Sequence, residues 1–160
     1  MAVGKSTLAR ALATTLDWVV VDKDDAADVL VNYLEDYSPA SYEIMFRQTE
    51  SLLDQGFNVV MVSSFRGELG LNNAAALAAR QGAELKVISC VCSDKRLWRS
   101  RLESRTPRPA QLITTWQVFE AYWARAANDF GYDISHPHLE IDTSMAIDKN
   151  IKRISSWLEE

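Results

Sequence analysis

A short run of residues near the start of the chain has the composition of a phosphate-binding loop. Gly4-Lys5-Ser6-Thr7 matches the second half of the pattern G-x-x-x-x-G-K-[ST]. In this pattern backbone N–H groups surround nucleotide phosphates, the lysine neutralises phosphate charge, and the first hydroxyl binds magnesium. We therefore predict that these four residues bind ATP together with Mg²⁺, with Ser6 as a metal ligand.

The beginning of this pattern is absent from the sequence. Its first glycine, and the apolar strand that leads into such a loop, would lie before Met1. We therefore expect either a domain that is incomplete at its N-terminus or a degenerate loop. Because Gly-Lys-Ser also occurs by chance, the prediction of a phosphate site needs support from other residues.

Two carboxylates follow the first apolar run after the loop. Asp22 and Asp24 come directly after the segment Trp18-Val19-Val20-Val21. Phosphoryl transfer requires a metal ligand and a group that orients the attacking hydroxyl, and Asp22 and Asp24 are our candidates for these two roles. The alternative is that both acids only stabilise the start of a helix.

Cations are concentrated in one part of an acidic chain. Residues 95–108 contain six Lys or Arg and a single acid, whereas the whole chain has a formal net charge of −5. Arg101 or Arg105, together with Arg108, are candidates for closing over the phosphates. The alternative is a solvated helix face, although such faces usually mix both signs of charge.

The elements that must position these residues alternate between strands and helices. The expected strands are nearly continuous apolar runs, which is typical of a parallel sheet covered on both faces. They are expected at residues 17–22, 57–62, 85–92 and 138–143, and a fifth is implied before Met1. The expected helices cover residues 8–16, 23–34, 40–55, 71–80, 94–105, 112–126 and 147–158. The sequence therefore predicts an α/β fold, doubly wound, with one domain over residues 1–160.

Polar residues follow three of these strands. They are Asp22 with Asp24, Ser63 with Arg66, and Asp94 at the start of the cationic helix. Ligands of open parallel sheets bind outside the carboxyl ends of the strands, so we expect the site there.

Composition excludes several classes of protein. The net charge argues against an extended nucleic-acid surface. No run of 18 apolar residues and no signal peptide is readable, so we expect a cytoplasmic protein without a membrane span. Cys90 and Cys92 alternate along one strand and are expected to be buried thiols, and we do not expect a metal at His136 and His138.

The motifs together resemble a known family. The loop at residues 4–7, the sequence Val-Asp-Lys-Asp-Asp at 21–25 and the lid-like helix at 97–105 look like those of AAA-type P-loop kinases. These kinases are similar in layout to shikimate kinase, chloramphenicol phosphotransferase, zeta toxin and the polynucleotide 5′-kinase domain. The resemblance covers nearly the whole chain and implies a three-layer P-loop kinase fold whose first strand is missing.

The resemblance also implies roles for individual residues. Asp24 would contact or deprotonate the acceptor hydroxyl, Asp22 would lie near magnesium, and Arg101 and Arg105 would belong to a lid. Many members of the family have an acid after the third strand, where this chain has Ser63-Ser64.

These observations favour a kinase that transfers the γ-phosphoryl group of ATP to a small hydroxyl compound. Residues 24–42 and 107–137 are expected to form the acceptor pocket, whereas Trp116, Phe119 and Trp123 are expected to be core. Two alternatives stay open, namely an ATPase or nucleotide-binding module without an acceptor, and a non-catalytic truncated remnant. The sequence does not predict the acceptor or the oligomeric state.

Overall fold

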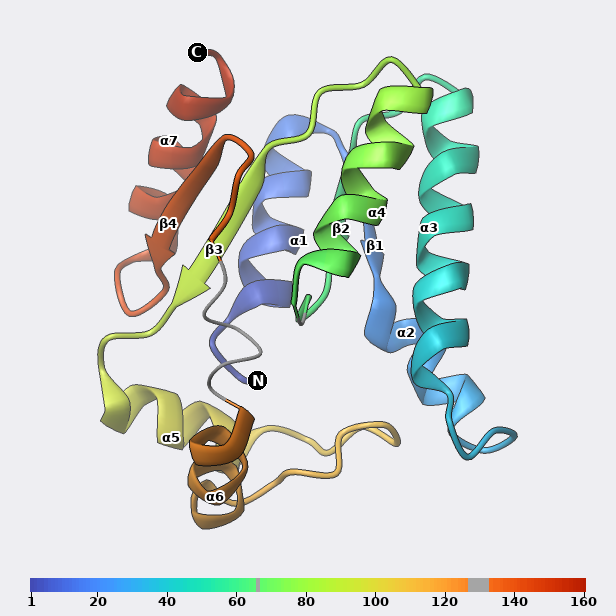
Figure 1. Ribbon diagram of the computed structural model, residues 1–160. Coiled ribbons are helices and arrows are strands. Elements are labelled where there is room, and N and C mark those ends of the chain that lie inside the picture. The colour runs from blue at the N-terminus through green and yellow to red at the C-terminus, as the bar shows by residue number, and fades with distance from the viewer. Residues whose placement is uncertain (66, 127–132) are drawn as a thin grey trace.

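The computed structural model describes residues 1–65, 67–126 and 133–160. Helices and strands alternate along most of the chain (Figure 1). The helices are α1 (Lys5–Leu16), α2 (Lys23–Leu30), α3 (Ser38–Asp54), α4 (Gly67–Arg80), α5 (Lys95–Ser104), α6 (Trp116–Ala126) and α7 (Ile147–Leu158). The strands are β1 (Val19–Asp22), β2 (Val59–Val62), β3 (Val87–Val91) and β4 (His138–Asp142).

The strands are parallel, as predicted, but they form two pairs. β1 lies beside β2 with Val19 opposite Val59. β3 lies beside β4 with Val87 opposite His138. Within the described ranges no ladder joins β2 to β3, so each of these two strands has an unpaired edge. The N-terminus lies between the two pairs, near the carboxyl ends of the strands (Figure 1).

Helices cover these strands and form the core with them. α1 packs on β1, β2 and α7, while α3 packs on β1 and β2 and also contacts α2 and α4. Leu8 and Leu12 lie on the predicted apolar face of α1. They are buried against Ile141 of β4 and against Ile151 and Ile154 of α7. One apolar face of α1 therefore joins the first strand pair to the last strand and helix.

Local signals explain where several helices begin. Asp22 accepts a hydrogen bond from the backbone N–H of Asp24 and so caps α2. Asp94 accepts from Arg96 and Leu97 at the start of α5, as its position in the sequence predicts. Pro39 lies in the first turn of α3, where its missing N–H costs no helical hydrogen bond.

α5 and α6 form a separate layer below the strands (Figure 1). Trp98 of α5 lies between aromatic rings of α6, with ring-centre distances of 5.0 Å to Phe119, 5.8 Å to Trp116 and 6.1 Å to Trp123. Phe119 is buried, so this cluster is core, as predicted. It attaches α6 to the cationic helix.

Two predicted helices are too long. The helix expected over residues 23–34 ends at Leu30. The stripe expected from Leu112 to Ala126 begins at Trp116, and Leu112 lies outside the helix with its side chain 80% exposed. The residues before Trp116 are held instead by long-range contacts, since the backbone N–H of Ala110 donates to Asp28 and the side-chain amide of Gln111 donates to Asp24. Tertiary contacts therefore override the helical periodicity here.

Two features are absent from the described residues, a membrane-spanning helix and a metal-binding cluster. Among the described residues no helix combines the length and apolar character needed to cross a bilayer. The same part of the chain contains no cluster of three or more His, Cys, Asp or Glu that could hold a metal. Cys90 and Cys92 are free thiols, and Cys92 is buried.

Candidate active site

A cavity of about 1620 Å³ lies at the carboxyl ends of the strands. Its lining comes from the start of the chain through α1, from the β1–α2 junction, from the start of α3, and from the end of β2. Residues of α5, of the segment after α5 and of the β4–α7 connection complete it. Lys5, Asp22 and Asp24 share this cavity, as the predicted site requires.

The phosphate-loop residues form the beginning of α1. Gly4 has a φ of 94° and directly precedes the helix, so it supplies the left-handed turn that the loop needs. A Cβ at Gly4 would lie only 3.3 Å from the Thr143 side chain and 3.4 Å from Arg101. Lys5, Ser6 and Thr7 follow in the first helical turn and line the cavity.

Lys5 is a half-buried ammonium beside two carboxylates. Burial lowers its pKa, and the nearby Cys90, Asp24 and Asp22 only partly oppose that shift. Burial likewise raises the pKa of the Cys90 thiol to about 11, although Lys5 opposes this change. A bound polyphosphate would add negative charge close to this ammonium and so oppose the effect of burial further.

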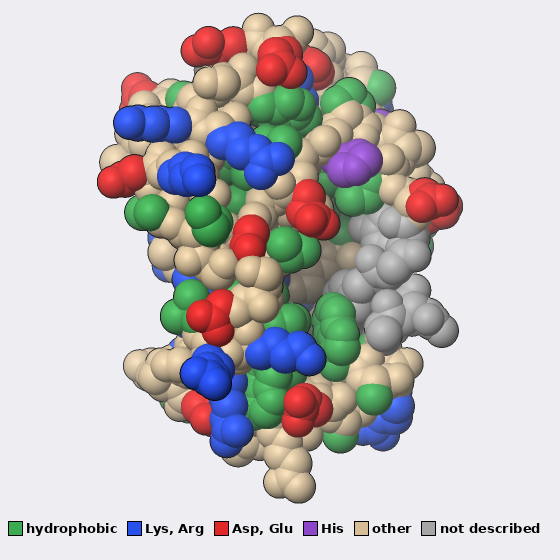
Figure 2. Space-filling model, turned by 90° about the vertical axis from the view of Figure 1, so that its left-hand side faces the viewer, with side chains coloured by type: hydrophobic (Ala, Val, Ile, Leu, Met, Phe, Trp, Pro, Cys, Tyr) green, Lys and Arg blue, Asp and Glu red, His purple; other side chains and the backbone are tan. Residues whose placement is uncertain are grey.

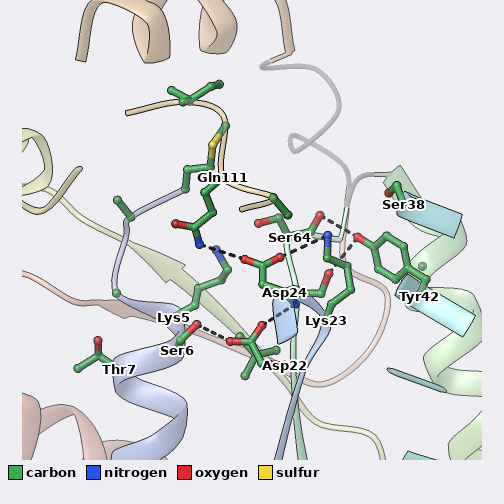
Figure 3. Close-up of a pocket in the computed structure, with 18 of the residues that line it drawn as sticks. Lys5, Ser6, Thr7, Asp22, Lys23, Asp24, Ser38, Tyr42, Ser64 and Gln111 are labelled. Carbon is green, nitrogen blue, oxygen red and sulfur yellow. Dashed lines mark hydrogen bonds and ion pairs between the residues drawn. The ribbon is translucent and has the colours of Figure 1, made fainter. Parts of the chain in front are cut away.

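Side-chain oxygens of Ser6 and Asp22 lie together in the cavity. The hydroxyl of Ser6 donates to a carboxylate oxygen of Asp22 over 2.8 Å, and Asp22 is buried (Figure 3). Mg²⁺ is usually bound by one or two protein oxygens together with water and phosphate. The donor set therefore fits magnesium, with no need for a cluster of several acidic side chains. Asp22 also caps α2 through its other carboxylate oxygen, which is the structural role considered as the alternative.

The carboxylate of Asp24 is held from two sides. One oxygen lies 3.3 Å from the ammonium of Lys23, and the other accepts from the amide of Gln111 over 3.5 Å (Figure 3). Lys23 is also 5.4 Å above the ring of Tyr42. Asp24 therefore lies in the cavity with a partner at each carboxylate oxygen, which suits a group that meets an incoming hydroxyl.

Tyr42 connects α3 to the end of β2. Its hydroxyl accepts from Ser63 over 2.9 Å and donates to the carbonyl of Ser64 over 3.2 Å. Ser63 and Ser64 thus line the cavity where the resemblance led us to look for an acid. Arg66, which the sequence pairs with Ser63, lies outside the described residues.

The six cations of residues 95–108 do not form one surface. Lys95, Arg96 and Arg99 are exposed, and Arg99 pairs with Glu103 over 3.1 Å. On the face shown in Figure 2, Lys and Arg side chains alternate with Asp and Glu. The other three cations, Arg101, Arg105 and Arg108, are partly buried and turn toward protein partners.

Arg101 is attached to the phosphate loop through Thr143. It donates to the hydroxyl of Thr143 over 3.1 Å and to the carbonyl of Thr143 over 2.8 Å. The same hydroxyl lies within hydrogen-bonding distance of the carbonyl of Val3. Arg101 therefore links α5, the end of β4 and the start of the loop.

Arg105 lines the cavity, whereas Arg108 is not part of its lining. Burial lowers the pKa of Arg105, against the opposing charge of Asp24. The Nε atom of Arg105 is buried and has no hydrogen-bond partner within the described ranges. Arg108 forms ion pairs with Asp25 and Asp28, so the predicted phosphate contact of Arg108 would require both pairs to break.

Sequence reasoning missed two residues of this site, Lys23 and Thr143. Tyr42 and Gln111 fall within the ranges expected to form the acceptor pocket, but no role was assigned to either residue. Lys23 adjoins Asp24 and was detectable from that position alone. The others carry no local signal, because residue 111 meets residue 24 only in the folded chain.

Comparison with known proteins shows the family and the fold of the chain. The sequence profile described as an AAA domain matches residues 1–128. The chain belongs to the AAA domain family. No curated protein matches the chain.

Solved structures of kinases share the fold of this AAA domain. A candidate kinase from Chloroflexus aurantiacus is 21% identical with a TM-score of 0.66, over 98% of this chain and 90% of that one. The APS kinase of Mycobacterium tuberculosis, solved with AMPPNP and APS, is 16% identical with a TM-score of 0.67, over 99% and 92%. A sugar kinase from Janibacter is 12% identical with a TM-score of 0.66, over 99% and 89%. The P-loop kinase fold predicted from the sequence is therefore confirmed.

Proposed function

We propose that this AAA domain is an ATP-dependent kinase that phosphorylates a hydroxyl group of a small molecule. The observation that carries the proposal is the single cavity shared by Lys5, Ser6, Asp22 and Asp24. It combines a phosphate loop, a pair of metal-binding oxygens and a separate carboxylate for the acceptor. The fold supports nucleotide binding and phosphotransfer, and the APS kinase with this fold was solved with an ATP analogue.

In the proposed reaction the acceptor hydroxyl oxygen attacks the γ-phosphorus of ATP. A new P–O bond forms, the bond from that phosphorus to the β–γ bridging oxygen breaks, and ADP leaves. The proton of the acceptor hydroxyl passes to Asp24, whose carboxylate Lys23 and Gln111 orient. Positioning and charge neutralisation supply most of the rate enhancement in such transfers.

Cations of the chain would neutralise the phosphates. Lys5 is a half-buried residue of the loop, and its lowered pKa would rise again when phosphate charge is close. The buried Nε of Arg105 gains a partner if a phosphate oxygen binds there, which removes the cost of an unsatisfied buried donor. Arg101 shapes the loop and borders the same cavity. Ser6 and Asp22 would hold Mg²⁺, which neutralises charge on the β- and γ-phosphates.

The two ends of the cavity differ in character. Met145 and Ile147 are exposed apolar residues beside the loop and suit the adenine base. The acceptor end lies beyond Asp24, where Tyr37, Tyr42 and Phe46 line the wall. We further propose that residues 1–160 act as one domain and that the protein works in the cytoplasm, where ATP is available and free thiols persist.

Asp24→Asn tests this proposal. We expect AMPPNP affinity by calorimetry to stay within about twofold of the parent protein, because Asp24 is assigned to the acceptor and not to the phosphates. Transfer of label from γ-labelled ATP to a panel of glucose, glycerol, ethanolamine, serine and uridine should fall at least ~100-fold, within the range that proton-transfer groups contribute. Asp54→Asn, at the exposed end of α3, is the matched control.

Other outcomes would favour another function. Equal loss of AMPPNP binding and transfer would make Asp24 a structural residue. Release of labelled phosphate to water alone, with no labelled product from any panel compound, would favour an ATPase or switch module. Absence of AMPPNP binding by the parent protein would favour the non-catalytic remnant.

A further inference from the structure

The segment between α5 and α6 extends from α5 toward α2 (Figure 1). Its contacts with α2 are made mainly by Arg108. One guanidinium nitrogen of Arg108 lies 2.7 Å from a carboxylate oxygen of Asp25, and Nε donates to Asp28. Two carboxylates of one helix therefore hold one guanidinium of a segment about eighty residues away.

The backbone of the same segment is held as well. The N–H of Ala110 donates to the second carboxylate oxygen of Asp28 over 3.0 Å. The carbonyl of Ala110 accepts from the hydroxyl of Tyr37 over 3.4 Å. Asp28 therefore binds a side chain and a backbone amide at once. We call the contacts of Arg108 and Ala110 with Asp25 and Asp28 the α2 clamp.

The α2 clamp determines where Gln111 lies. The N–H of Gln111 donates to the carbonyl of Arg108 over 2.9 Å, so the two residues belong to one tight turn. Gln111 then reaches Asp24. Asp24 and Asp28 are four residues apart on α2 and thus share a face. The clamp therefore holds Gln111 to the same rigid helix that carries the carboxylate it contacts.

The ion pair between Arg108 and Asp28 is less exposed than a typical surface ion pair, so it is expected to constrain the position of the segment. The Asp28 and Arg108 side chains are only 17% and 29% exposed, whereas most surface pairs are well solvated and contribute little. Burial alone would lower the pKa of Arg108, but its hydrogen bonds to Asp28 and Asp25 raise the pKa above the ordinary arginine value. A partly buried, charge-assisted contact of this kind constrains geometry strongly.

We propose that Arg108 is a positioning residue of the transfer reaction, in which the α2 clamp holds residues 105–113 over the acceptor end of the cavity and places Gln111 on Asp24. This inference rests on the proposed kinase function. It gives Arg108 a role through Asp24 and not through the phosphates of ATP. Removing the clamp is expected to impair transfer and to leave nucleotide binding intact.

Arg108→Met and Asp28→Asn test the inference, singly and together. Arg80→Met is the matched control, because Arg80 forms a 3.1 Å pair with Glu50 between α4 and α3, away from the cavity. Each protein is measured for AMPPNP affinity, for ADP formation from saturating MgATP with the five-compound panel, and for amide hydrogen exchange. The hydrogen-exchange measurement requires neither ATP nor an acceptor.

We expect Arg108→Met and Asp28→Asn each to lower ADP formation at least ~10-fold, with AMPPNP affinity within about twofold of the parent protein. The double variant should be no worse than the poorer single variant, since both remove one interaction. Exchange at the amides of Ala110 and Gln111 should accelerate at least ~10-fold, while α1 exchanges as before. Arg80→Met should behave like the parent protein.

Two results would overturn the inference. One is that Arg108→Met loses AMPPNP affinity as much as turnover, which would indicate that Arg108 contacts the phosphates of ATP. The other is that exchange at Ala110 and Gln111 stays unchanged in both clamp variants. If the parent protein neither binds AMPPNP nor forms ADP, the proposed function fails, and the exchange result still decides whether the clamp exists.

Discussion

At the scale of one residue, Lys5 is placed for nucleotide binding but lowers the stability of the nucleotide-free fold. Burial lowers the pKa of this ammonium, so the folded nucleotide-free protein binds that proton less tightly than the unfolded chain does. Because the folded-state pKa is depressed, charged Lys5 destabilises the fold at neutral pH. That penalty disappears once the pH has risen above the pKa of lysine in the unfolded chain.

Lys5→Met should therefore change stability and binding in opposite directions. We expect the melting temperature of the nucleotide-free protein to rise at pH 7, and this gain to shrink toward pH 11. AMPPNP affinity should fall at least ~10-fold, because a phosphate contact is lost. Circular dichroism and calorimetry provide the two readings, with the exposed Lys149→Met as control. A lower melting temperature with unchanged affinity would contradict both assignments.

At the scale of elements, one carboxylate adds to the joint between β3 and β4, which are already paired as parallel strands. Asp142, at the end of β4, accepts from the hydroxyl and the backbone N–H of Ser93 after β3. It also accepts from the N–H of Ser144 over 2.9 Å. The Ser93 hydroxyl, followed by the Ser144 backbone, lowers the pKa of Asp142 well below its usual range. The carboxylate thus ties together the ends of two strands that border the site.

This joint predicts a pH dependence. A carboxylate with a depressed folded-state pKa contributes stability above its unfolded-state pKa, and the contribution is lost as the pH falls through the folded-state value. The parent protein should therefore lose more melting temperature between pH 6 and pH 3 than Asp142→Asn does. Thermal melts followed by circular dichroism measure this difference. Parallel curves for the two proteins would show that the contacts of Asp142 do not support the β3–β4 joint.

At the scale of the whole molecule, the two strand pairs leave β2 and β3 with unpaired edges. The residues of β3 are only partly buried, although the strand is apolar. Unpaired N–H and C=O groups on an apolar strand are a template for association with other strands. The 160-residue chain should accordingly aggregate on concentration and melt broadly. A monomer with a sharp melt at high temperature would contradict this expectation.

An engineered extension tests the same feature directly. Five apolar β-branched residues and a phosphate-loop segment fused before Met1 should pair with both free edges and raise the melting temperature by at least ~5 °C. A Gly/Ser extension of equal length is the control. Light scattering should show less association for the strand-forming extension alone. Equal behaviour of the two extensions would mean that the edges do not accept a strand.

Several features of the fold and the site were predictable because they depend on neighbours in sequence. Gly4 and Lys5 begin a helix, Leu8 and Leu12 share its buried face, and Asp22 follows an apolar strand. Each of these features follows from helical or strand periodicity, from a turn residue or from a helix cap. All of these signals act over a few residues. Parallel strands then bring the polar residues at their ends to one edge.

The sequence by itself thus determined the α/β class, the phosphate loop and the two carboxylates after β1. Only the tertiary structure decided which arginines reach the cavity, why the helix expected at Leu112 begins at Trp116, and that Gln111 meets Asp24. The physical reason is distance along the chain, since the α2 clamp joins residues about eighty positions apart. Local propensity carries no information about such a contact, and its charge and burial energies exist only after the chain has folded.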